Sequence, residues 1–273
     1  MVSVIDAKRA FSRRSALLWL LLLNVALFVA LRLVAAAEAI AGVEGWLDTA
    51  ITAVSLPTSP MRLIASPWTL LSYMFAQFDV NHLLFNMLWL AWFGLFMQND
   101  FGNRRTVAAY FTGGFAGAVT YVLWSILSPE ASVASTGLIG SSAAVISVAL
   151  AVAVAEPSRP IEVLFFGNVK LKWVAVVMTA IALIWFSGYN HGSDMAHAGG
   201  ALTGVALGLY LRRNVGSASE CVQFNMDEDE KNDPADDVQL DNLLDKIRCS
   251  GYDSLSVEER AKLFELSQRI KKG

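Results

Sequence analysis

Long apolar runs, separated by short polar segments, dominate the first 213 positions of the chain. Six of these runs approach the roughly 20 residues that an α-helix needs to cross a bilayer. They cover approximately residues 15–36, 82–97, 106–127, 136–155, 173–186 and 194–211. The second and fifth are short, and the sixth is rich in glycine and alanine. The pattern predicts an all-α membrane protein with a bundle of six transmembrane helices.

Composition and charge favour the same interpretation. Hydrophobic residues make up 55% of the 273 positions, and the mean hydropathy of +0.48 is too high for an ordinary soluble domain. With a cytoplasmic N-terminus, the cytoplasmic loops carry 11 of the 13 lysines and arginines in residues 1–213, and only Arg32 and Arg62 lie on the outer side. This asymmetry predicts that both termini are cytoplasmic.

The first apolar run has a second interpretation. Basic residues precede it, as they do in a secretory signal peptide, but the run is longer than the usual 7–15 residues of such peptides. A retained helix is therefore favoured. The loop after it, residues 37–81, contains enough apolar residues that we expect it to lie in the membrane interface.

The end of the chain differs in composition from the membrane part. Residues 214–273 hold 8 basic and 14 acidic residues. Within them, Ser256 and Glu259 form a capping box that predicts the start of a helix, and Gly251 predicts the end of the one before. The expected organisation is a cytoplasmic N-terminus at 1–14, a membrane domain at 15–213, an acidic disordered linker at 214–236 and a small cytoplasmic helical hairpin at 237–273.

Four polar residues are predicted at one depth in the outer half of the membrane. His82 opens the second span, Asn86 lies one turn below it, Ser142 is near the start of the fourth span and His197 is near the start of the sixth. Taken one at a time, Ser142 and Asn86 are ordinary helix-packing residues and His82 is an ordinary interfacial residue. His197 is harder to explain in that way, because an ionisable residue within a membrane usually has a function.

Together these residues predict acyl-transfer chemistry. A serine hydroxyl becomes a nucleophile when an imidazole takes its proton, so Ser142 and His197 must lie within hydrogen-bond reach. Such an approach needs small residues on the facing helices. Gly200, Gly204 and Gly208 follow His197 on one face, and the fourth span offers small residues at the same spacing, namely Ala143, Ser147 and Ala151. His82, Asn86 and the backbone N–H groups at the start of the fourth span are suitable donors to an oxyanion.

Three motifs resemble those of the rhomboid family of intramembrane serine proteases. "HLLFN" at residues 82–86 is similar to the HxxxN of their second helix, "GSSA" at 140–143 to their GxSG, and "HAGGALTG" at 197–204 to their HxxGxxxG. The resemblance covers about residues 15–213. It implies a Ser–His dyad of Ser142 and His197, and an oxyanion site at His82, Asn86 and the backbone of Ser141 and Ser142. It also implies cleavage of transmembrane protein substrates near the outer membrane face, in a bacterial inner membrane.

The sequence departs from the family pattern at several positions. Ala143 replaces the last glycine of GxSG. Trp68 is similar to the tryptophan of a loop Trp-Arg pair, but Thr69 follows it. Ile146 replaces an aromatic residue that is frequent in the family, and residues 98–100 read Gln-Asn-Asp where ExR is expected. These departures affect loop anchoring and histidine positioning, and the dyad is retained.

Two other functions fit the same residues. An inactive rhomboid-like protein would bind transmembrane helices without cutting them, although such relatives typically lose the serine or the histidine. A transporter would line a polar path with Ser142, His197, His82 and Asn86, but no inverted repeat of broken helices is visible. The chain has no HExxH, and Cys221 and Cys249 form no CxxC, so neither a metal nor a cofactor is predicted. The expected partners are transmembrane protein substrates and the lipid bilayer, and no nucleic acid.

Overall fold

The computed structural model describes residues 15–128, 137–163, 167–185, 191–226, 242–244, 246–247 and 255–270. The chain forms two compact units, Met1–Asn214 and Val215–Gly273. The first unit contains the apolar runs, and the second contains the tail. The predicted N-terminal segment at 1–14 lies outside the described residues.

Six helices of the first unit correspond to the six apolar runs. They are α2 (Ala16–Ala41), α6 (Val80–Phe101), α7 (Asn103–Leu127), α9 (Ser142–Ala155), α10 (Leu171–Trp185) and α11 (His191–Met226). Among the described residues, α2, α6 and α7 are long and apolar enough to cross a membrane, while α9 and the Leu171–Ala182 part of α10 are apolar but shorter. The chain is therefore a mostly helical integral membrane protein, in which three spans meet the length criterion.

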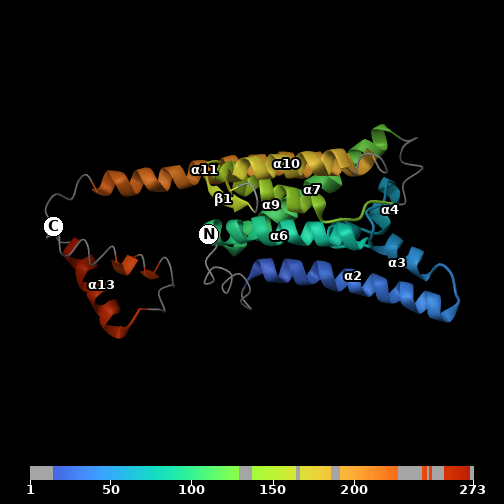
Figure 1. Cartoon of the computed structure of the whole chain (residues 1–273), viewed down its shortest axis with the longest axis horizontal. Helices are drawn as coiled ribbons and strands as arrows, with labels where there is room; N and C mark the ends of the chain where they lie inside the picture. Colours follow the sequence, from blue (N-terminus) through green and yellow to red (C-terminus); the bar gives the residue numbers. More distant parts are fainter. Residues whose placement is uncertain are drawn as a thin grey trace. The chain divides into compact units, whose positions relative to one another are not determined.

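Helix α9 lies at the centre of the bundle. Every residue from Ala143 to Ala153 is buried, which explains why this helix is apolar on all sides. It packs against α6, α7 and α10, and Figure 1 shows α6 between α9 and α2. At 14 residues, α9 is about 21 Å long, against a hydrocarbon thickness of about 30 Å. A helix that reaches one membrane edge at its C-terminal end therefore begins, at Ser142, inside the membrane.

The fourth span starts later than its apolar pattern predicts. The predicted run begins at residue 136, whereas α9 begins at Ser142. The residues before it form an extended loop in which Leu138 exchanges two backbone hydrogen bonds of 2.9 Å with Leu56. Gly137 and Gly140 have φ of 111° and 137°, a region that is not helical and that favours glycine. Backbone geometry therefore delays the start of the helix until Ser142.

The segment between α2 and α6 contains three short helices rather than an irregular loop. They are α3 (Trp46–Val54), α4 (Pro60–Ala65) and α5 (Thr69–Ser72). Their exposed surface is apolar, with Met61, Ile64 and Trp68 each more than half exposed. Such a surface suits the membrane interface that the sequence predicts.

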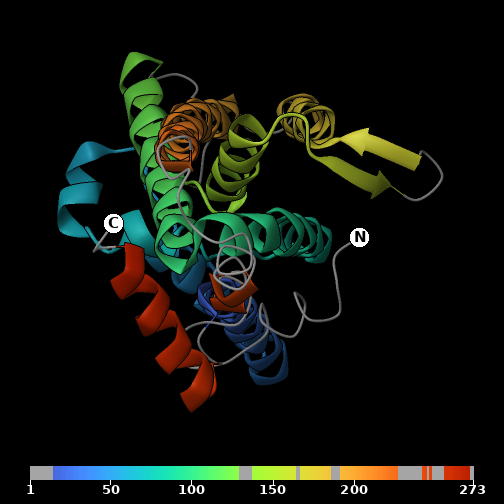
Figure 2. The same ribbon diagram turned by 90° about the vertical axis from the view of Figure 1, so that its left-hand side faces the viewer.

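A two-stranded hairpin connects α9 to α10. Strands β1 (Pro160–Val163) and β2 (Gly167–Lys170) pair in antiparallel fashion, and Figure 2 shows the hairpin projecting from the bundle beside α10. Arg159 fixes its base, because its guanidinium pairs with Asp100 at the end of α6 and with Glu156 at the end of α9. The hairpin is thus tied to the end of α9 opposite Ser142.

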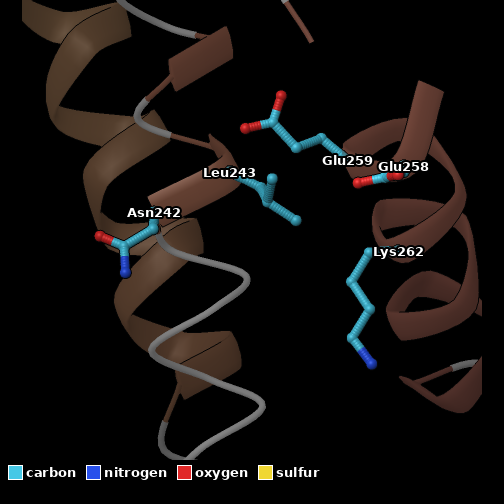
Figure 3. Close-up of a pocket in the computed structure, with 5 residues that line it drawn as sticks. All are labelled: Asn242, Leu243, Glu258, Glu259 and Lys262. Carbon is cyan, nitrogen blue, oxygen red and sulfur yellow. The ribbon is translucent and has the colours of Figure 1, made fainter. Parts of the chain in front are cut away.

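The tail contains the predicted capping box. At the start of α13 (Val257–Ile270), the Glu259 N–H donates to Ser256 Oγ at 3.2 Å and the Ser256 N–H donates to Glu259 Oε2 at 2.7 Å. Leu243 and Leu255 form a small apolar core. Figure 3 shows Leu243 facing α13 across an open pocket, whose other lining residues are Asn242, Glu258, Glu259 and Lys262.

Helix α11 crosses the boundary between the two compact units, which lies between Asn214 and Val215. Helix α11 continues to Met226 and so includes the first part of the segment 214–236, which was predicted as a disordered linker. The apolar pattern of the sixth run stops at residue 211, but the residues that follow up to Met226 contain no proline to end the helix. Residues 227–241 and Gly251 lie outside the described residues.

Candidate active site

Ser142 and His197 meet between α9 and α11. Ser142 is the first residue of α9, and its Oγ lies 2.6 Å from Nε2 of His197. His197 is in the second turn of α11 and only 3% of it is exposed. In a neutral imidazole whose Nε2 carries no proton, this nitrogen accepts the serine O–H, which is the arrangement that activates a hydroxyl.

The neighbouring serine has a different partner. Ser141 caps α9, is fully buried, and its Oγ accepts a hydrogen bond of 3.1 Å from Nε2 of Gln77. The Ser142 hydroxyl thus points to α11 and the Ser141 hydroxyl to the segment before α6, because neighbouring residues at a helix start project about 100° apart. Of the two, Ser142 is the one in contact with an imidazole.

The approach of α11 to α9 depends on three glycines. A Cβ added at Gly200 would lie 2.2 Å from the carbonyl oxygen of Ala143, and one at Gly204 would lie 2.6 Å from that of Ser147. A Cβ at Gly208 would lie 2.6 Å from the Ala151 carbonyl oxygen. The three contacts repeat every four residues along both helices. There is no room for a side chain at any of these three positions of α11.

Two glycines of α7 bring this helix equally close to α9. A Cβ on Gly113 would lie 2.1 Å from that of Ser147, and a Cβ on Gly117 would lie 2.7 Å from that of Ala143. Ala143 is therefore enclosed by glycines on both sides. Its backbone faces Gly200 on α11, and its methyl group faces Gly117 on α7.

His82 lies beside the serine, across Gly140. It is in the first turn of α6, where its backbone N–H donates to the capping carboxylate of Asp79 at 2.8 Å. A Cβ on Gly140 would lie 3.0 Å from Cε1 of His82 and 3.7 Å from Oγ of Ser142. The imidazole therefore occupies the space that a side chain at position 140 would fill, next to the hydroxyl.

Asn86 belongs to a buried set of amide side chains. Its Nδ2 donates to Oε1 of Gln77 at 2.9 Å, and Nε2 of Gln77 donates to Oδ1 of Asn24 at 3.0 Å. Gln77 and Asn24 are both fully buried. Our sequence analysis did not identify either of them. The signal for Asn24 was present, since it is a polar residue inside the first apolar run.

A family model describes the core of the chain. The model of the rhomboid domain matches residues 65–214, more than half of the sequence. The chain belongs to the rhomboid family. This confirms the resemblance of the three motifs, and makes the protein a rhomboid-type intramembrane protease or an inactive relative of one.

Individual relatives agree with the family assignment. The rhomboid is 31% identical over 147 residues to RHOMBOID-like protein 4 of Arabidopsis thaliana, covering 53% of this chain and 34% of that one. It is 26% identical over 152 residues to Rhomboid-like protease 3 of Toxoplasma gondii, covering 54% and 53%. It is 30% identical over 146 residues to the mitochondrial RHOMBOID-like protein 6 of Arabidopsis thaliana, covering 53% and 43%. The matches span between a third and a little over half of these relatives.

The tail matches a separate family. Residues 224–269 match DUF6576, a family of unknown function. The match begins near the end of α11 and includes most of α13. No residue of the candidate site lies within it.

The positions at which this rhomboid departs from the family pattern have local partners of their own. Gln98 Oε1 accepts hydrogen bonds from Ser15 Oγ at 2.9 Å and from the Leu17 N–H at 3.0 Å, so it joins the end of α6 to the start of α2. Asp100 forms the ion pair with Arg159 at the base of the β1–β2 hairpin. Thr69 is buried and donates to the Ser66 carbonyl at 2.7 Å. These contacts anchor the helix ends without the arginines that the family pattern leads one to expect.

Trp68 and Ile146 lie in different surroundings. Trp68 is 56% exposed, and its Nε1 donates to the Ala53 carbonyl at 2.9 Å, which ties α5 to α3. Ile146 is buried in α9, one turn after Ser142. Trp68 therefore anchors the interface segment through a backbone carbonyl, and Ile146 contributes to the apolar core.

Proposed function

We propose that this rhomboid is an intramembrane serine endopeptidase that cleaves transmembrane protein substrates near the outer face of the membrane. The observation that carries the proposal is the 2.6 Å contact between Ser142 Oγ and His197 Nε2. A hydroxyl at that distance from an imidazole nitrogen can transfer its proton as it attacks. The second observation in its support is that α9 is too short to span the bilayer, which agrees with a hydroxyl inside the membrane when the C-terminal end of α9 lies at a membrane edge.

The reaction runs through an acyl-enzyme. Ser142 Oγ attacks the carbonyl carbon of the scissile peptide while Nε2 of His197 takes the hydroxyl proton. The C–N bond then breaks, and His197 returns the proton to the leaving amine. Water, deprotonated by the same imidazole, attacks the ester carbonyl. The ester bond to Ser142 then breaks, the acid is released, and His197 returns the proton to Ser142 Oγ. No carboxylate is required to act as a third member.

The negative charge that forms on the carbonyl oxygen needs donors. We assign His82, the Asn86 side chain and the backbone N–H groups of Ser141 and Ser142 to this role. His82 lies beside Ser142 across Gly140, and the first N–H groups of α9 have no partner within the helix. The positive end of the α9 dipole stabilises the same charge. Removing one such donor typically lowers kcat on the order of 100-fold to 1,000-fold.

The proposal also specifies how the protein is oriented in the membrane and which part of the chain carries out the reaction. The basic residues favour cytoplasmic N- and C-termini, which places the start of α9 on the outer side of a bacterial inner membrane. All the assigned groups lie within residues 15–213, so the membrane domain carries the reaction. The segments 214–236 and 237–273 are then a cytoplasmic linker and appendage without a catalytic group.

The decisive experiment compares the wild type with Ser142→Ala and His197→Ala in liposomes that contain a model transmembrane substrate. We expect cleavage only by the wild type. A fluorophosphonate probe, which reacts with activated serine hydroxyls, should label Ser142 in the wild type and in the matched control Ser141→Ala. It should not label His197→Ala. A folded wild type that binds the substrate helix but neither cleaves it nor reacts with the probe would instead be an inactive, helix-binding rhomboid.

A further inference from the structure

A chain of hydrogen bonds runs from α2 to the candidate oxyanion site. Asn24 Nδ2 donates to the Leu20 carbonyl at 2.9 Å and to the Tyr110 hydroxyl at 3.0 Å. The Tyr110 hydroxyl donates in turn to the Met74 carbonyl at 2.7 Å. Gln77 then links Asn24 to Asn86 and to Ser141 through the bonds described above. The chain thus joins α2, α6, α7 and the start of α9 to the segment before α6.

The Leu20 carbonyl at one end of this chain determines which group donates and which accepts in the bonds that follow. A backbone carbonyl can only accept, so Asn24 must turn its NH₂ group toward Leu20 and its oxygen toward Gln77. Gln77 must therefore present its NH₂ group to Asn24, and its oxygen toward Asn86. Asn86 is left with its NH₂ group as the donor. The orientation of the Asn86 amide therefore follows from the Leu20 carbonyl, by way of the Asn24 and Gln77 amides between them.

Because these side chains are buried, reversing the donor and acceptor arrangement of their amides would cost free energy. Asn24, Gln77 and Tyr110 are fully buried, and Asn86 is 7% exposed. Turning any one amide around would place oxygen against oxygen and NH₂ against NH₂. A buried polar group that loses its partner costs about 1–3 kcal/mol, and water is not at hand to replace the partner.

We propose that Gln77 is a positioning residue for the reaction, which holds Asn86 as an oxyanion donor. One N–H of the Asn86 amide is bound by Oε1 of Gln77, which fixes the amide plane and leaves the second N–H for the substrate oxygen. The Gln77 amide also donates to the Ser141 hydroxyl at 3.1 Å, but the group of Ser141 that we assign to the oxyanion is its backbone N–H, so the proposed effect on kcat runs through Asn86. This inference rests on the proposed protease function.

The alternative is that Gln77 only satisfies buried polar atoms and stabilises the fold. The two roles differ in what they do to kcat. A residue that acts through Asn86 has no effect on kcat once Asn86 is gone, whereas a purely structural defect adds to any other. A donor that works in the transition state also changes kcat and leaves KM nearly unchanged.

The test is a double-mutant cycle with purified full-length protein and a transmembrane substrate in liposomes. Asn86→Ala should lower kcat on the order of 100-fold. Gln77→Met, similar in size but without the amide, should lower kcat by at least about tenfold with KM held, because a donor misplaced by about 1 Å loses much of its effect. The double variant should be no slower than Asn86→Ala. Equal kcat in Gln77→Met and wild type, or losses that multiply in the double variant, would overturn the assignment.

A matched control separates positioning from loss of stability. Thr106 is fully buried, and its hydroxyl donates to the Gly102 carbonyl at 3.1 Å in the first turn of α7, one turn before Tyr110. Thr106→Val removes a buried hydrogen bond that does not belong to the chain. It should lower the unfolding midpoint and leave kcat unchanged. If Thr106→Val lowers kcat as much as Gln77→Met does, the effect of Gln77 is one of stability alone, and the inference is wrong.

Gln77→Glu keeps the proposal testable where Gln77→Met does not fold. A carboxyl group buried in this site is neutral, so its carbonyl oxygen can still accept from Asn86 and its O–H can donate to Asn24. We expect kcat to fall by less than about fivefold. A larger fall in a folded Gln77→Glu protein contradicts positioning through an acceptor. Failure of the wild type to cleave overturns this inference together with the proposed function, whereas an inert Gln77 in an active, Ser142-dependent enzyme overturns this inference alone.

Discussion

Adding one methyl group at Gly200 tests whether the close approach of α11 to α9 sets the Ser142–His197 contact. In Gly200→Ala the new Cβ would lie 2.2 Å from the carbonyl oxygen of Ala143, where an ordinary contact is at least 3.4 Å. The carbonyl belongs to the backbone, so no rotamer change relieves the overlap. The helices must separate by about 1 Å, and overpacking of this kind costs about 1–3 kcal/mol of stability.

The separation of α11 from α9 directly lengthens the contact between Ser142 and His197. Gly200 lies one turn after His197, and Ala143 is next to Ser142, so nearly the whole shift is added to the 2.6 Å between Ser142 Oγ and His197 Nε2. At about 3.6 Å the pair is no longer hydrogen-bonded. A misplacement of about 1 Å lowers the rate on the order of 100-fold, which is the loss of kcat that we expect.

Gly208→Ala is the matched control, because its methyl would lie 2.6 Å from another α9 carbonyl, that of Ala151. It is eight residues further along α11, about 12 Å from the position of Gly200. Cleavage kinetics and thermal unfolding of both variants, measured in the same detergent, separate the two effects. The unfolding midpoints should fall by similar amounts, and kcat should fall at least about tenfold more in Gly200→Ala. Equal losses of kcat, or wild-type kcat in Gly200→Ala, would refute the reasoning.

Three further predictions concern other parts of the chain. Gly117→Ala would place a methyl 2.7 Å from that of Ala143 and should lower stability by about 1–3 kcal/mol in denaturant unfolding, and Ala143→Gly in the same chain should restore part of the loss. A chain truncated after Asn214 should cleave substrate at the wild-type rate, and loss of activity in a folded truncated protein would give the tail a role in the reaction. Hydrogen bonds from Lys246 and a backbone N–H lower the pKa of Glu259, so the protection factors for amide exchange at the start of α13 should be highest above about pH 4.3 and decrease as the pH falls through the lower folded pKa.

Apolar periodicity predicted the helices well and their ends less well. All six runs contain a helix, because about 20 consecutive apolar residues leave a membrane chain no other way to satisfy its backbone. The start of α9 was placed too early because Leu138 and Ile139 extend the apolar run beyond the N-terminus of the helix. What delays the helix is the positive φ of Gly137 and Gly140, together with the backbone pairing of Leu138 with Leu56. Neither hydropathy nor residue spacing reports such contacts.

The candidate site also contains residues that the sequence predicts and residues that it does not. Ser142, His197 and the facing glycines are visible in the sequence because their spacing repeats with the helix. Gln77 is not, because it lies just before α6, in a segment with no clear period, and its importance arises only when α2, α6 and α9 come together around it. A glutamine in such a segment is ordinarily a solvated residue. Tertiary contact, and no local pattern, makes it a buried link between Asn24 and Asn86.

Ala143 shows how a departure from a motif is absorbed by a residue far away in the sequence. The family pattern has glycine at this position, and an added methyl next to the nucleophile would be expected to push α11 away. In this chain the methyl points toward α7 instead, where Gly117 leaves room for it. The side of Ala143 that faces Gly200 is backbone, which is the same for alanine and glycine. The two helices that enclose α9 therefore place different demands on this one residue. The α11 side requires glycine at 200 whatever residue 143 is. On the α7 side, the tightest contact of a side chain at 117 would be with the Ala143 methyl, so glycine at 117 is what allows alanine at 143.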